Sequence, residues 1–126
     1  LVNMRSGPGE RYPIEWVYKR VNMPVEIIDA YEYWYKVKDF ENTSGWMHKK
    51  MLSQKRYGLT APNGKTAVYK KEDATSDVIA YFDGSSIVQL LKCSPKSAFC
   101  LISYEQLKGY VLKKDIFGVY PNEEID

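Results

Sequence analysis

An internal repeat is the feature of this sequence that most constrains its fold. The residues at 45–52, GWMHKKML, return at 109–116 as GYVLKKDI, an offset of 64 positions. Residues 25–28 and 34–37 correspond in the same way to 88–91 and 99–102, at offsets of 63 and 65. A chain of 126 residues that repeats at this spacing is predicted to form two small units of about sixty residues each.

The residue types favour strands over helices. Eleven Tyr, three Trp and four Phe are present, many of them beside Val and Ile, and such residues prefer pleated, half-buried strands. Short alternating stretches recur between polar or Gly/Pro clusters, whereas the spacing of an amphipathic helix does not. Strands in the first unit are predicted at 2–5, 15–19, 25–29, 34–39 and 43–48. We therefore predict an all-β fold of two tandem small β-barrels.

Domain boundaries follow from the repeat and from composition. We predict a first barrel at 1–53, a linker at 54–65, and a second, divergent barrel at 66–126 that ends in a C-terminal tail. The linker prediction rests on a stretch rich in polar residues, Gly and Pro. Turn residues at 6–9 and 41–43 predict an irregular loop and a tight hairpin, and 49–52 predicts a single helical or 3₁₀ turn.

Several motifs of the first unit, in order and spacing, resemble the bacterial SH3 domain family. They are VNMRSGPG at 2–9, YP at 12–13, WYKV at 34–37, and GWMH at 45–48 followed by Leu52. The ending FGVYP at 117–121 resembles an exported, tandem SH3-like subgroup found in alphaproteobacteria. The second unit has TAVYKK at 66–71 in place of the loop signature, so its first loop is expected to differ. The resemblance implies SH3-like barrels that bind cell wall or peptide outside the cytoplasm, without catalysis.

Cys93 and Cys100 are predicted to form a disulfide. Cys93 ends one predicted strand and Cys100 lies in the next, a spacing that suits a bridge across a hairpin. Two buried, reduced thiols are the alternative. Because disulfides persist in oxidising compartments, we predict a periplasmic or otherwise extracytoplasmic location, with a signal peptide removed. The single histidine cannot complete a Cys2His2 zinc site, and no metal or cofactor is predicted.

The charge and motif inventory weighs against several function classes. Eighteen Lys and Arg against sixteen Asp and Glu give a net charge of +2, far from the basic excess typical of nucleic-acid-binding proteins. His48 lies in a different repeat from both cysteines, and no Gly-rich phosphate loop occurs. Glu123 and Glu124 are expected to be solvated charges in a polar tail. No catalytic site and no transmembrane helix are predicted.

Strand alternation suggests where a ligand would bind. It places Tyr35 and Val37 on one face of their strand and Trp34 on the other. If the first two face the core, Trp34 points outward and could floor a groove for an extended peptide or a sugar. The alternative is that the aromatic rings of this unit only cover a small core, which is the expectation favoured for Trp46. The predicted ligand-binding residues are Tyr12, Trp16, Tyr18, Trp34 and Trp46.

These observations predict a non-catalytic binding module of the cell envelope that recognises peptidoglycan or an extended peptide. We expect its site between the loop region 6–20 and the strand carrying Trp34. The second unit, with Phe99 at the Trp34 position, is expected to be structural support. A periplasmic protein-protein scaffold is the first alternative and a nucleic-acid-binding SH3-like barrel the second. Lys49, Lys50, Lys55 and Arg56 are expected to form a solvated face or to contact an anionic wall polymer.

Overall fold

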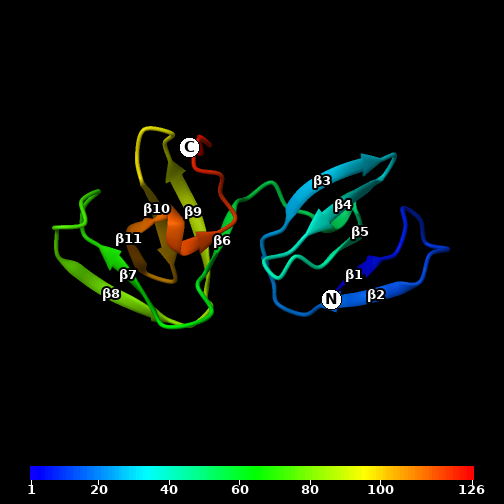
Figure 1. Cartoon of the computed structure of the whole chain (residues 1–126), viewed down its shortest axis with the longest axis horizontal. Coiled ribbons are helices and arrows are strands. Elements are labelled where there is room, and N and C mark those ends of the chain that lie inside the picture. Colours follow the sequence, from blue (N-terminus) through cyan, green and yellow to red (C-terminus); the bar gives the residue numbers. More distant parts are fainter. The chain divides into compact units, whose positions relative to one another are not determined.

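A computed structural model describes all 126 residues and shows two β-sheets and no α-helix (Figure 1). The sheets have five and seven strands, and no strand of one sheet pairs with a strand of the other. The chain divides into two compact units, Leu1–Gln54 and Lys55–Asp126. The all-β prediction is therefore confirmed. No helical segment reaches the length and hydropathy needed to cross a membrane.

The first unit is one antiparallel sheet of short strands. Its order is β2-β1-β5-β4-β3, so β2 and β3 are edge strands that do not pair with each other. The predicted barrel is therefore not closed by hydrogen bonds, because its two edge strands do not pair with each other. All five predicted strands are present, with ends displaced by at most two residues. The elements are β1 (Val2–Arg5), β2 (Ile14–Tyr18), β3 (Glu26–Tyr31), β4 (Trp34–Lys38), β5 (Ser44–His48) and the 3₁₀ turn η1 (Lys49–Met51).

The second unit repeats this arrangement and adds two strands to it. Its order is β12-β6-β9-β10-β11-β7-β8, and the five strands from β8 to β9 match β2 to β3 of the first unit one by one. The sequence repeat thus reflects a repeated strand order. The elements are β6 (Tyr57–Thr60), β7 (Lys65–Tyr69), β8 (Val78–Asp83), β9 (Ile87–Cys93), β10 (Phe99–Tyr104), β11 (Leu107–Leu112), η2 (Lys113–Asp115) and β12 (Ile116–Phe117).

Both units contain the same two β-bulges. Glu15 of β2 and Ile79 of β8 are the extra residues in one pair of hairpins. Ile28 of β3 and Leu91 of β9 are the extra residues in the other. A bulge bends its strand and increases the local twist, so these four residues curve each sheet around its core.

A glycine at the start of β5 and of β11 permits close packing in each unit. A Cβ atom on Gly45 would lie 2.6 Å from Cγ of Met4, and one on Gly109 would lie 2.5 Å from Cγ1 of Val68. Met4 and Val68 are buried at equivalent positions of the two cores. The repeated glycine is therefore a packing requirement.

The linker predicted at 54–65 is wrong over Tyr57–Thr60. These residues form β6, which pairs with both β9 and β12, and three of the four are buried. Thr60 is buried without loss of hydrogen bonding, because its hydroxyl donates to the Gly84 carbonyl at 2.8 Å and accepts from the Ser86 N–H at 2.7 Å. Only Leu59 in this strand is aliphatic, so the sequence carries little apolar signal there.

Glu123 and Arg56 were both expected to be solvated charges, but the structure pairs them with each other. The Arg56 guanidinium binds both carboxylate oxygens of Glu123, at 2.9 Å for Nη2 and Oε1, and donates to the Gly118 carbonyl at 2.8 Å. The hydrogen bond from Arg56 is the main cause that lowers the pKa of Glu123. This ion pair holds the C-terminal segment against the second unit.

Cys93 and Cys100 form the predicted disulfide. They lie directly opposite each other on β9 and β10, with their Cα atoms 4.5 Å apart. That is the spacing of an antiparallel pair whose backbone groups point away from each other. The N–H and C=O of Cys93 instead pair with Ile125 in two 2.8 Å hydrogen bonds. Cys93 therefore contacts β10 through the disulfide and the C-terminal segment through its backbone.

The first unit has a small core. Met4, Val37 and Met47 are the fully buried residues at its centre. Tyr35 packs against them from the face that alternation predicted. We call this side of the sheet the inner face and the opposite side the outer face.

Candidate functional site

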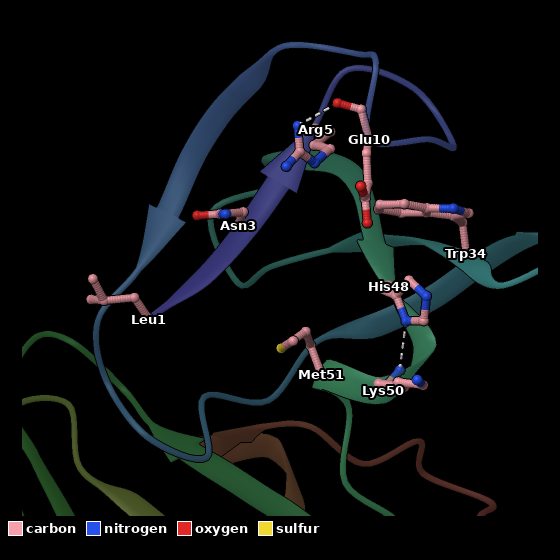
Figure 2. Close-up of a pocket in the computed structure, with 8 residues that line it drawn as sticks. All are labelled: Leu1, Asn3, Arg5, Glu10, Trp34, His48, Lys50 and Met51. Carbon is pink, nitrogen blue, oxygen red and sulfur yellow. Dashed lines mark hydrogen bonds between the residues drawn. The ribbon is translucent and has the colours of Figure 1, made fainter.

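A groove of about 350 Å³ lies on the outer face of the first unit (Figure 2). Strands β1, β4 and β5, the loop after β1, and the turn η1 contribute to it. It lies between that loop and the strand carrying Trp34, where sequence analysis expected a ligand. The groove is lined by Leu1, Asn3, Arg5, Glu10, Trp34, His48, Lys50 and Met51.

Arg5 fixes the loop that forms one wall of the groove. Its Nη1 donates to the carbonyls of Glu10 at 3.0 Å and Tyr12 at 2.9 Å. Tyr12 covers Gly7, where any Cβ atom would overlap its ring. Tyr12 is thus a half-buried part of the loop and does not line the groove, although it was predicted to bind ligand. The same loop directs the Glu10 side chain toward Trp34 (Figure 2).

Trp34 and His48 form the opposite wall. They are directly opposite each other on β4 and β5, and their rings meet edge to face with centroids 5.2 Å apart. The Nδ1 atom of His48 accepts a 3.2 Å hydrogen bond from the Lys50 N–H and so caps η1. His48 therefore orients both the Trp34 ring and the turn that carries Lys50.

Two tyrosines extend this wall. Tyr31 lies opposite Trp34 on β3, and Tyr33, in the turn between them, stacks its ring parallel to that of His48 at 6.4 Å. Tyr31 is 54% exposed and Tyr33 is 71% exposed. Tyr31, Trp34 and His48 thus form what we call the aromatic row, which crosses three neighbouring strands. These tyrosines were not among the predicted site residues. Alternation alone would place Tyr31 on the face opposite to Trp34, and only the hairpin turn at 32–33 brings the two together.

Trp16 and Tyr18 do not join Trp34, so the predicted grouping of these residues is wrong. Trp16 is paired with the buried Met4, which places it on the inner face. Tyr18 packs against the core and donates a 2.7 Å hydrogen bond to Asp39. The error arose because the register of the strand predicted at 15–19 was not known, and pairing with β1 turns Trp16 and Tyr18 toward the core side.

Trp46 lies on the outer face but beside the groove. It pairs with Arg5 on one side and with Lys36 on the other, and it is half-buried. The neighbouring Met47 takes the core position of this strand, so of the two positions expected for Trp46, core or barrel wall, it takes the wall. Of the predicted ligand-binding residues, Trp34 alone lines the groove.

Asp39 is a buried residue that stabilises the fold, and it was not among the residues predicted from the sequence. It is 3% exposed, and its Oδ1 accepts hydrogen bonds of 2.9 Å from the N–H groups of Glu41 and Thr43. Asn42, at φ 65°, completes this turn. Burial, followed by the hydrogen bond to Asp39, raises the pKa of Tyr18 above its ordinary value. The signal was present as an Asp at the start of a short polar turn.

The second unit has no equivalent polar groove. Strand pairing places Tyr69 at the position of Arg5, and the repeat places Phe99 at that of Trp34 and Leu112 at that of His48. Phe99 is 8% exposed, and its ring meets that of Tyr69 edge to face at 5.8 Å. Apolar packing thus occupies the region that carries polar side chains in the first unit. The structure contains no group of three or more His, Cys, Asp or Glu that could hold a metal ion.

Residues 1–54, which make up the first unit, match the family model described as Bacterial SH3 domain. A search of curated proteins finds no match. Among solved structures the chain is similar to NlpC2 from Trichomonas vaginalis, with 18% identity and a TM-score of 0.44. That similarity covers 94% of this chain and 43% of the other, so the chain spans less than half of that protein. Assignment to an exported alphaproteobacterial subgroup stays a prediction.

Proposed function

We propose that the chain is a non-catalytic binding module of the cell envelope, which recognises peptidoglycan or an extended peptide. The observation that carries this proposal is the outer-face groove, where Trp34 and His48 of the aromatic row lie beside polar side chains. The side chains of Asn3 and Lys50 in this groove make no hydrogen bond within the protein, so both are available to a ligand. Concave sites that combine aromatic surface with a few polar groups are typical binding sites.

Two further findings support the compartment and the role. The disulfide between Cys93 and Cys100 supports an oxidising, extracytoplasmic location. The match of the first unit to the bacterial SH3 domain family supports binding as its role. The apolar packing of Phe99 and Tyr69 supports a site in the first unit only, with the second unit as structural support.

Sedimentation with purified, insoluble peptidoglycan tests this proposal. We expect the full chain to sediment with peptidoglycan and Trp34→Ala to lower the affinity by about tenfold, as truncation of a central aromatic contact does. Trp16→Ala is the control, because it removes an indole that is 50% exposed but lies on the inner face, away from the groove. Retention on envelope proteins but not on peptidoglycan would indicate a scaffold instead. Equal loss in both variants would contradict the assignment of the groove.

A further inference from the structure

The groove lies in the middle of the sheet, not at its edge. In the order β2-β1-β5-β4-β3, the strands that line it, β1, β5 and β4, each have a neighbour on both sides. β4 pairs along its whole length with β3 and with β5, and β1 pairs with β5 at Arg5 and Trp46. A peptide that binds as an added strand needs a free edge. We therefore consider the side chains that line the groove as its binding groups.

The side chains of the aromatic row offer flat surfaces at regular intervals. Tyr31 is directly opposite Trp34, and Trp34 is directly opposite His48, all on the outer face. Directly paired residues of neighbouring antiparallel strands are about 5 Å apart, so the row extends about 10 Å across the sheet. The C–H face of a sugar ring packs on an indole or phenol ring of this size. The row is long enough to contact two successive sugars.

The polar side chains that line the groove can form hydrogen bonds with the substituents of a sugar ring. Asn3, Arg5 and Glu10 each end in a planar group with two adjacent polar atoms, and together they supply both donors and acceptors. Vicinal hydroxyls and acetamido groups pair with such groups through two hydrogen bonds. Glu10 carries the opposite charge to Arg5 and Lys50, so the lining does not select a strongly anionic or cationic ligand.

From these three relationships, and resting on the proposed function, we infer that the groove binds the glycan of its ligand. Trp34 and Tyr31 stack on N-acetylated sugar rings, and Asn3, Arg5 and Glu10 bind the polar substituents. The stem peptides of peptidoglycan are then not the part that the groove recognises.

A titration of the full chain with three separate probes tests this inference. The probes are a tetramer of N-acetylglucosamine, peptidoglycan glycan strands freed of their stem peptides, and the released stem peptides. The indole N–H signals of Trp16, Trp34 and Trp46 are followed by NMR and assigned from single substitutions. We expect both glycan probes to shift the Trp34 signal and to leave that of Trp16 in place.

The variants separate contact from folding. We expect Trp34→Ala to weaken glycan binding about tenfold, and Tyr31→Ala and Asn3→Ala to weaken it about threefold each. Tyr31 and Asn3 lie on the outer face, away from the core, so these two variants keep the inference testable if Trp34→Ala does not fold. Trp16→Ala should bind the glycan probes with unchanged affinity.

The other possible results would overturn the inference, the site or the proposed function. Trp34-dependent binding of stem peptides without glycan binding would overturn the inference and leave the proposed function in place. The same holds if intact peptidoglycan sediments the chain through Trp34 while neither glycan probe binds. Glycan binding that depends on Trp16 instead of Trp34 would overturn the site. Failure to bind any probe or intact peptidoglycan would overturn the proposed function as well.

Discussion

The phenol O–H of Tyr18 donates a 2.7 Å hydrogen bond to Oδ2 of Asp39, which is 3% exposed. This bond joins the edge strand β2 to the hairpin between β4 and β5. Asp39 uses its other oxygen to accept two backbone N–H groups of that hairpin. Tyr18 therefore links the edge strand β2 to the turn between β4 and β5. Because its hydroxyl is used in this hydrogen bond, it is not available to a ligand.

Replacement of Tyr18 by Phe should destabilise the first unit without affecting binding. The substitution keeps the ring but leaves Oδ2 of Asp39 without its donor, which costs about 1 to 3 kcal/mol for a buried acceptor. Urea denaturation followed by tryptophan fluorescence measures this, because all three Trp residues lie in the first unit. Sedimentation with peptidoglycan should be unchanged. Weaker sedimentation at full stability would instead return Tyr18 to the binding site.

The same variant gives an alkaline test. The pKa of Tyr18 is raised in the folded unit, chiefly by burial, so the folded state keeps its proton more tightly than the unfolded state does. The stabilisation from Tyr18 is then fully present below its unfolded pKa of about 10 and is lost as the pH rises toward the folded pKa. The free energy of unfolding of Tyr18→Phe should fall less between pH 9 and 11. Parallel curves for the two proteins would contradict this cause.

The ionised carboxylate of Glu123 makes the free energy of unfolding of the second unit depend on pH in the acid range. Its pKa is lowered, first by the hydrogen bond from Arg56, so its stabilisation is present above the unfolded pKa near 4.5 and is lost as the pH falls through the folded pKa. Because the pair is partly exposed to solvent, the effect is at most about 1 kcal/mol. Glu123→Gln should lower stability at pH 7 and show a flatter acid transition by circular dichroism. Tryptophan fluorescence, which reports the first unit, should be identical in both proteins.

The sequence predicts the strands well because their signals are local. Alternation of Tyr35 and Val37 with Trp34 predicts which residues face the core, and the repeat at 64 positions predicts that the two units share an arrangement of strands. The disulfide follows from the same hairpin spacing. β6 could not be predicted in this way, since Thr60 is buried through hydrogen bonds rather than through hydrophobicity.

The candidate site is predicted only in part, because it depends on contacts between distant residues. Trp34 is found from alternation alone. The inner-face position of Trp16 depends on its register with Met4, and the bulge at Glu15 shifts that register within one short strand. The aromatic row needs three strands to be adjacent, and the capping of η1 by His48 needs the fold itself. None of these relationships is visible in a local pattern.

Addition of one methyl group at Gly45 should destabilise the first unit. The new Cβ atom would lie 2.6 Å from Cγ of Met4 and 2.9 Å from the Arg5 carbonyl oxygen, and the backbone oxygen cannot move aside without disturbing β1. Overpacking of this kind costs about 1 to 3 kcal/mol. Urea denaturation by tryptophan fluorescence should show this loss for Gly45→Ala. The double variant with Met4→Ala tests the cause, since it relieves the contact with Met4 and should lose less than the sum of the two single changes.

Reduction of the disulfide should weaken the second unit and spare the first. In the chain-entropy model a loop of this length contributes about 2 to 3 kcal/mol. With dithiothreitol present, the circular dichroism transition of the second unit should move to lower temperature while the tryptophan transition does not. Hydrogen exchange at Ile125 should accelerate, because its backbone partner Cys93 is then held less tightly. Recovery of both thiols by alkylation of oxidised, unreduced protein would show that the bridge does not form.

Phe99→Ala should lower stability and Trp34→Ala should lower binding, although the two residues are equivalent in the repeat. Phe99 is 8% exposed and packs edge-on against Tyr69, so its truncation removes core contacts and should cost about 3 to 5 kcal/mol in the second unit. Trp34 lies at the groove on the outer face, so its truncation should cost binding and little stability. Thermal denaturation by circular dichroism and sedimentation with peptidoglycan, measured on both variants, give the comparison. If Phe99→Ala abolished binding while Trp34→Ala only unfolded the first unit, the ligand site would have to be moved to the second unit.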